Sequence, residues 1–218
     1  MSLVSSPEQN QGIGAQVLSE QGELPLHSGM VLPITPERIK IAKLVYEGVG
    51  LRLEAEKLER RPFHKQPGKV FSLISQSNMF FEQLGQMSGI EMLQRSDRVD
   101  MEGNCADYVF GERLNESWIK HGNVDVNFWH NPLSFLAKQG YQSVDSPQAG
   151  DVVAYGGFDQ REKKILFQHF GIYTDDNRVD SKFQAGPIFR HRVDLVSSEV
   201  GGAVYFLRRT ALPQTLAA

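Results

Sequence analysis

The stretch "ILFQHFGIYT", residues 165–174, decides the fold class of this 218-residue chain. It is rich in β-branched and aromatic residues, which predicts a strand. Because alternate side chains of a strand point to opposite faces, we expect His169 and Gly171 on one face and Phe170 and Ile172 on the other. A strand of this kind would hold a histidine on a rigid element.

Four further runs of the same composition surround this strand, and Gly, Asp, Asn and Pro separate them. They read "GDVVAYGG" (150–157), "NRVDSKF" (177–183), "IFRHRVD" (188–194) and "GAVYFLRR" (202–209). Such a series of short strands predicts a meander that forms an antiparallel sheet.

The earlier part of the chain carries helical patterns. Thr35 as a cap and Pro36 at the first helical position predict a helix start, and Gly48 and Gly50 are expected to weaken the helix that follows. Gly140 is expected to end the last helix. The expected helical segments are 36–59, one or two short helices within 70–94, a helix that begins at residue 105, and 131–140. Helices followed by strands indicate an α+β fold.

Composition excludes several functional classes. The chain is 40% hydrophobic with a net charge of −3 and shows no basic stripe, so nucleic acid is not an expected partner. No run approaches the roughly 18 apolar residues of a membrane span, and no secretory signal is visible. We therefore expect no membrane partner and, by default, a cytoplasmic protein, with signal-independent export left open.

No cofactor or metal is expected either. The chain has one cysteine, which cannot form an intramolecular disulfide, and it lacks C-x-x-C and H-E-x-x-H spacings.

The single cysteine, Cys105, lies in "MEGNCADYVF" (101–110). We expect it in the first turn of a helix, where unpaired backbone amides and the helix dipole lower the pKa of a thiol. Asn104 and Gly103 would cap that helix and let a substrate backbone approach. The alternative is a small buried residue, which is the commonest role of a free cysteine.

A cysteine nucleophile needs a histidine as its base. Among six histidines, His169 is the best candidate because it lies on a predicted strand, and His191 is a second strand histidine. The other four, His27, His64, His121 and His130, lie in the predicted arm or in polar, loop-like surroundings.

The order "NCADYV", "PQAGDVVAYGG" and "HFGIYTDDNRV" resembles that of the NlpC-type cysteine peptidases. This branch of the papain-like hydrolases includes bacterial cell-wall amidases and endopeptidases. In the family a cysteine opens a helix packed on an antiparallel sheet, a "GDLV"-like strand follows, and an "HVGIY"-like strand presents the histidine. Cys105, Gly150 with Asp151, and His169 occupy these places, and the resemblance covers about residues 100–208.

The resemblance implies a papain-like, NlpC-type fold with helices packed on an antiparallel sheet and an N-terminal helical extension. Together with the composition and the helical patterns, it divides the chain into four regions. They are a flexible arm (1–35), a helical extension or cap (36–100), a catalytic domain (101–210) and a tail (211–218).

The implied activity is a cysteine hydrolase that cleaves an amide bond in a peptide or a peptidoglycan stem peptide through a thioester acyl-enzyme. An acyltransferase of the same fold and a catalytically inactive binding or regulatory module are the alternatives.

The family also implies a third polar residue that orients the histidine. Counting along the hairpin places Ser181 there, and serine is a poor orienting group. A one-residue shift in the turn would present Asp180 instead, and His191 on the next strand is a third candidate. The oxyanion hole would be the backbone amide of Cys105 with one further donor that the sequence does not identify.

Overall fold

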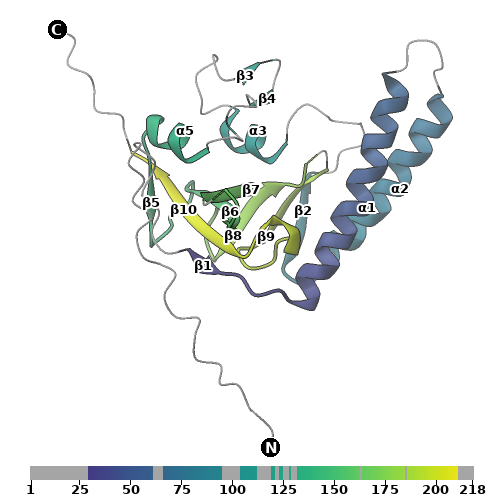
Figure 1. The fold of residues 1–218 in the computed structure, drawn as a ribbon. Coiled ribbons are helices and arrows are strands. Elements are labelled where there is room, and N and C mark those ends of the chain that lie inside the picture. Colours follow the sequence, from purple (N-terminus) through teal and green to yellow (C-terminus); the bar gives the residue numbers. More distant parts are fainter. Residues whose placement is uncertain are drawn as a thin grey trace, which may run out of the picture.

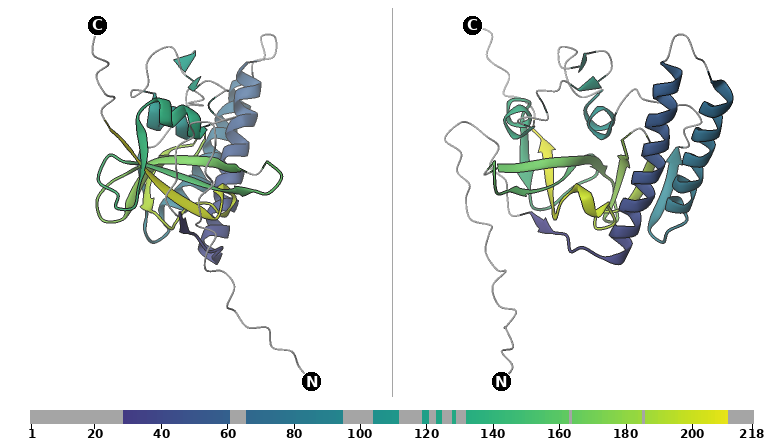
Figure 2. Two further views of the ribbon diagram at one scale, coloured as in Figure 1. Left: turned by 60° about the vertical axis from the view of Figure 1, so that its left-hand side comes forward. Right: turned by 45° about the vertical axis from the view of Figure 1, so that its right-hand side comes forward.

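A curled antiparallel sheet lies at the centre of the protein, with helices on both of its faces (Figure 1). The computed structural model describes residues 29–60, 66–94, 104–111, 119–120, 123–124, 128, 132–162, 164–184 and 186–210. The curl makes the sheet a half-barrel, which Figure 2 shows from two further directions. The predicted α+β class and the antiparallel sheet are therefore confirmed.

The strand order in the sheet is β1-β10-β6-β7-β8-β9-β2, and β5 also pairs with β10. The bounds are β1 (Met30–Val31), β2 (Ile90–Gln94), β5 (Tyr141–Val144), β6 (Val152–Asp159), β7 (Lys164–Tyr173), β8 (Arg178–Lys182), β9 (Ile188–Arg192) and β10 (Ala203–Arg209). Two short strands, β3 (Ile119–Lys120) and β4 (Asn123–Val124), pair with each other. All five predicted strands are present, and β6 to β9 form the expected meander.

Two long helices, α1 (Pro36–Glu59) and α2 (Pro67–Gly85), form a hairpin against one face of the sheet. The predicted start of α1 is confirmed, because the Thr35 hydroxyl accepts a hydrogen bond from the Arg38 amide at 3.2 Å. Gly48 does not interrupt α1. A Cβ at this position would lie 2.9 Å from the Phe81 ring of α2, so the glycine allows the two helices to approach closely.

The other face carries α3 (Cys105–Phe110) and α5 (Pro132–Lys138). Gly140, with a φ of 77°, follows α5 in the left-handed conformation that was predicted to end it. The sheet thus separates two buried clusters. Phe110 and Phe170 belong to the cluster under α3 and α5, and Phe81 and Tyr155 belong to the cluster under α1 and α2.

Two predictions about the N-terminal part need correction. Residues 29–35, which fall in the predicted flexible arm, include β1 and the buried Leu32, while 1–28 lie outside the described residues. The segment 90–94, which was expected to be helical, is instead the strand β2, which pairs with β9. Five residues are too few for a helical period to be told from an alternating one, and pairing with β9 decides the outcome. The predicted tail at 211–218 is also outside the described residues.

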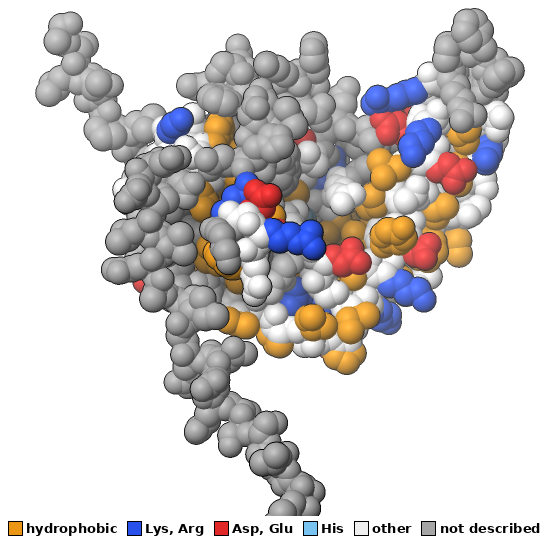
Figure 3. Space-filling view, viewed as in Figure 1, with side chains coloured by type: hydrophobic (Ala, Val, Ile, Leu, Met, Phe, Trp, Pro, Cys, Tyr) orange, Lys and Arg blue, Asp and Glu red, His pale blue; other side chains and the backbone are white. Residues whose placement is uncertain are grey.

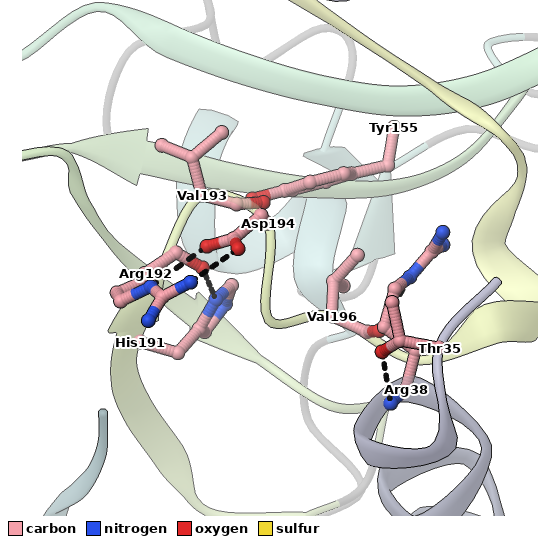
Figure 4. Close-up of polar contacts among 8 residues, drawn as sticks. All are labelled: Thr35, Arg38, Tyr155, His191, Arg192, Val193, Asp194 and Val196. Carbon is pink, nitrogen blue, oxygen red and sulfur yellow. Dashed lines mark hydrogen bonds and ion pairs between the residues drawn. The ribbon is translucent and has the colours of Figure 1, made fainter. Parts of the chain in front are cut away.

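Arg38 ties the start of α1 to the loops beside it. The side chain is 1% exposed, and its guanidinium donates hydrogen bonds to five backbone carbonyls. These belong to Leu32, Pro33, Val196, Ser197 and Gly201. Leu32 directly follows β1, and Ser197 caps the short 3₁₀ helix η2 (Ser198–Val200), so the Arg38 side chain links the start of α1 to the segments beside β1 and η2. Figure 4 shows Arg38 beside Val196 and Thr35.

None of the helices within the described residues is both long and apolar enough to cross a membrane.

Candidate active site

Cys105 is the first residue of α3, as predicted. The Asn104 side chain accepts hydrogen bonds from the amides of Ala106 (2.8 Å) and Asp107 (3.3 Å), and the Asp107 carboxylate accepts one from the Asn104 amide (2.7 Å). This reciprocal capping box fixes the start of the helix and the position of the cysteine. Gly103, the other predicted capping residue, lies outside the described residues.

The predicted lowering of the Cys105 pKa is not observed. The backbone amides of Phe170 and Ala106 face the sulfur and lower its pKa, but burial outweighs them and raises the pKa to about 12. The thiol is 4% exposed, and α3 is only six residues long, so its dipole is weak. Cys105 is therefore a protonated thiol in this conformation.

His169 lies on β7 beside a β-bulge. It pairs with Tyr155 of β6, while the next pair joins Phe167 to Gly156, so Gln168 is the extra residue of the bulge. The His169 ring stacks on Phe183 at 5.0 Å between centroids. A β-bulge changes the direction of the side chains beside it, here those of Gln168 and His169.

Burial also sets the protonation state of His169. Its side chain is 3% exposed, and among the described residues its Nε2 has no hydrogen-bond partner. Burial, with a smaller electrostatic contribution from nearby His191, lowers the His169 pKa to about 3. The imidazole is therefore neutral near pH 7.

Cys105 and His169 reach the same pocket from opposite faces of the sheet. The alternation predicted for β7 is confirmed, because the Phe170 ring packs on Phe110 of α3, 5.3 Å between centroids, while His169 faces the side of α1. The pocket lies where β7 continues past its pairing with β8, which involves only residues 171–173.

The thiol of Cys105 makes no hydrogen bond to Nε2 of His169. Neither side chain contributes to the pKa shift of the other.

The pocket has a volume of about 630 Å³, within the range typical of small-molecule sites. Half of its lining comes from α1, and the rest comes from α3, β7, the end of β8 and the region of η2. The residues from α1 are Ala42, Val45, Tyr46, Glu47, Val49, Gly50, Leu51 and Leu53. The predicted extension thus forms a wall of the candidate site.

None of the three candidate orienting residues binds Nε2 of His169. Ser181, which counting along the hairpin placed at the orienting position, pairs with Gly171, and its hydroxyl lies 2.9 Å from Nε2 of His191. Nδ1 of His191 lies 2.8 Å from the Arg192 carbonyl (Figure 4), which can only accept, so Nε2 of His191 accepts the Ser181 proton. Burial lowers the pKa of His191 to about 4 and keeps it neutral.

Asp180 is the candidate that the register contradicts. It pairs with Ile172 rather than Gly171, so the proposed one-residue shift does not occur. Its carboxylate forms a bidentate ion pair with Arg190, at 2.8 and 2.9 Å.

The "GD" of the family-like motif has a structural role here. Gly150 has a φ of 93°, and the Asp151 carboxylate binds the Arg208 guanidinium at 2.7 Å. Neither residue lines the pocket.

Sequence reasoning missed several residues of the pocket. Gln168 and Gln184 present amide groups there, and Glu47 and Glu199 present carboxylates. For Gln168, the sequence offers one signal, a polar residue directly before a strand histidine. The bulge that directs Gln168 to the pocket depends on pairing with β6 and could not be predicted. Nothing in the sequence distinguishes Glu47 from the other charged residues of α1.

Within the part of the chain that the structure describes, no group of three or more His, Cys, Asp or Glu side chains is placed to hold a metal ion. The other four histidines, at positions 27, 64, 121 and 130, lie outside that part.

Comparisons with known proteins find no matching family model, no matching curated protein and no matching solved structure.

Proposed function

We propose that this protein is a cysteine hydrolase that cleaves an amide bond, with Cys105 as nucleophile and His169 as base. The observation that carries the proposal is that a cysteine at a capped helix start and a neutral histidine on a rigid strand line one pocket. The resemblance of the motifs to the NlpC-type peptidases supports a papain-like assignment and a peptide or peptidoglycan stem peptide as the substrate.

The reaction follows from these two groups. His169 takes the proton of the thiol, and the sulfur forms a bond to the substrate carbonyl carbon. The protonated imidazole then gives its proton to the amide nitrogen, the C–N bond breaks, and a thioester remains on Cys105. A water molecule, deprotonated by His169, attacks the thioester carbonyl carbon, the C–S bond breaks, and the thiol regains a proton.

In this proposal the bound substrate lowers the cost of the proton transfer. A thiol with a pKa of about 12 and a histidine with a pKa of about 3 exchange a proton at a high energetic cost. Polar groups of a bound substrate would reduce this cost, because desolvation is the largest cause of both shifts.

A non-catalytic binding module is the second candidate. It is favoured by the protonated thiol and by Nε2 of His169, which no described residue orients. In that case the pocket binds a ligand without cleaving it.

The experiment that separates the two candidates measures amine release from short peptides and from peptidoglycan stem peptides. The hydrolase is expected to lose activity by roughly a thousandfold in Cys105→Ala and His169→Asn. Asp180→Asn is the control, because Asp180 pairs with Arg190 away from His169 and should keep activity. Saturable binding of these peptides without amine release would instead establish the binding module, and added amine acceptors would reveal acyl transfer.

A further inference from the structure

The charged side chains that line the pocket are all negative. Among the residues that the structure describes, Glu47 and Glu199 are the charged residues that line the pocket, and none of the lining residues is a lysine or an arginine. Glu47 comes from α1 and Glu199 from η2, two elements that pack against each other. Among the described residues neither carboxylate has an ion-pair partner. Two uncompensated negative charges therefore stand at one pocket.

A second feature of the same pocket also points to a ligand. His169 is 3% exposed, and its Nε2 lacks any hydrogen-bond partner among the described residues. A buried polar atom without a partner is costly, and a ligand that hydrogen bonds to it removes the cost. The site is thus incomplete in its polar contacts as well as in its charge.

Most of the remaining wall is apolar. Val45, Tyr46, Val49 and Leu53 of α1 face the pocket together with Phe183 and Val200. Figure 3 shows hydrophobic side chains interspersed with charged ones on the viewed surface of the helical hairpin. A ligand that fits would place an apolar group along α1.

We infer that the pocket selects short peptides that carry a free, positively charged amino group next to an apolar side chain. The ammonium group lies between the carboxylates of Glu47 and Glu199, and the apolar side chain packs on α1. A substrate with a carboxylate or a neutral group at that place loses the electrostatic attraction. This inference rests on the proposed function, since it names the substrate class of the same site.

The test uses two chloromethyl ketones built on one apolar dipeptide, one with a free amino group and one acetylated at that group. Such reagents alkylate a cysteine by displacement of chloride, and the intact mass of the full-length protein measures the rate. At pH 7 and low salt the free-amine reagent should modify Cys105 about tenfold faster than the acetylated one.

The variants Glu47→Gln and Glu199→Gln should each reduce this preference several-fold. Glu37→Gln, an exposed change elsewhere on α1, should leave it unchanged. All three positions are exposed, so folding is not at risk. A preference that persists in both pocket variants overturns the role of the carboxylates.

The two levels of the proposal fail in different ways. If both reagents label Cys105 equally fast, and faster than a simple alkylating agent does, the amine inference is wrong and the hydrolase stands. If neither reagent labels Cys105 faster than a simple alkylating agent does, the proposed function itself fails.

Discussion

At the scale of single residues, burial controls both groups that are proposed for catalysis. It raises the pKa of the Cys105 thiol and lowers that of the His169 imidazole, so each side chain is neutral near pH 7. The helix-start position of Cys105 could be predicted from "GNCADY", but the degree of desolvation could not. That depends on Phe170 and the other aromatic rings packed beside it, which come from distant parts of the chain.

Alkylation of the free protein tests this protonation state. Iodoacetamide should modify Cys105 at pH 7.5 far more slowly than it modifies a free thiol, because a pKa of about 12 leaves almost no thiolate. The rate should rise about tenfold for each pH unit between pH 8 and 10, as long as the protein stays folded. Rapid labelling at neutral pH would show that the thiol is already activated.

The buried histidines predict a loss of stability in acid. The pKa of His169 is lowered to about 3 and that of His191 to about 4, while both titrate near 6.5 in the unfolded chain. The unfolded state therefore binds more protons below pH 6.5, and the free energy of unfolding falls as the pH decreases from 6.5 toward 4. Each histidine contributes roughly 1 kcal/mol per pH unit in this window.

Chemical denaturation across pH 4–7.5 measures the effect. His191→Asn keeps a donor near the position of Nδ1 but does not titrate, so its stability should depend less steeply on pH than that of the wild type. Equal slopes for the two proteins would contradict a buried neutral His191.

At the scale of elements, features set by the local sequence could be predicted, and features set by strand pairing could not. Thr35 and Pro36 correctly marked the start of α1, and alternation correctly placed His169 and Phe170 on opposite faces of β7. The bulge at Gln168 and the strand β2 could not be predicted, because both depend on a partner strand that is distant in sequence.

The two glycines of α1 provide a matched pair. A Cβ at Gly48 would meet the buried Phe81 ring at 2.9 Å, whereas a Cβ at Gly50 would have no neighbour within 4 Å. Gly48→Ala should therefore destabilise the protein by about 1–3 kcal/mol through overpacking. Gly50→Ala should stabilise it by up to about 1 kcal/mol through helix propensity.

Thermal and denaturant unfolding of both variants checks this contrast. Equal effects of the two changes would show that α1 and α2 are not in close contact at Gly48.

At the scale of the whole molecule, one buried cation holds the walls of the pocket in place. Arg38 joins the start of α1 to the carbonyls around η2, and both elements line the candidate site. No sequence pattern predicted that Arg38 would bind these carbonyls, because an arginine in the first turn of a helix is usually exposed to solvent. The overall assembly of α1, η2 and β7 around Cys105 likewise depends on contacts across the chain.

Arg38→Lys tests this role. A lysine cannot reproduce the planar set of donors, so several buried carbonyls would lose their partners. The free energy of unfolding should fall by about 3 kcal/mol or more. Arg161→Lys, at an exposed turn, should change it by less than about 0.5 kcal/mol. Similar small effects of both variants would contradict the role of Arg38 in joining α1 to the carbonyls around η2.

The central claim is that Cys105 carries an acyl group during the reaction with the help of His169. The most direct measurement is the intact mass of the full-length protein, acid-quenched during turnover of an activated ester of an apolar peptide with a free amino group. The account predicts the mass of one added acyl group, mapped to Cys105, absent in Cys105→Ala and formed at least about a hundredfold more slowly in a folded His169→Asn. Ester cleavage that continues unchanged in Cys105→Ala, or an acyl group mapped to another residue, would contradict it.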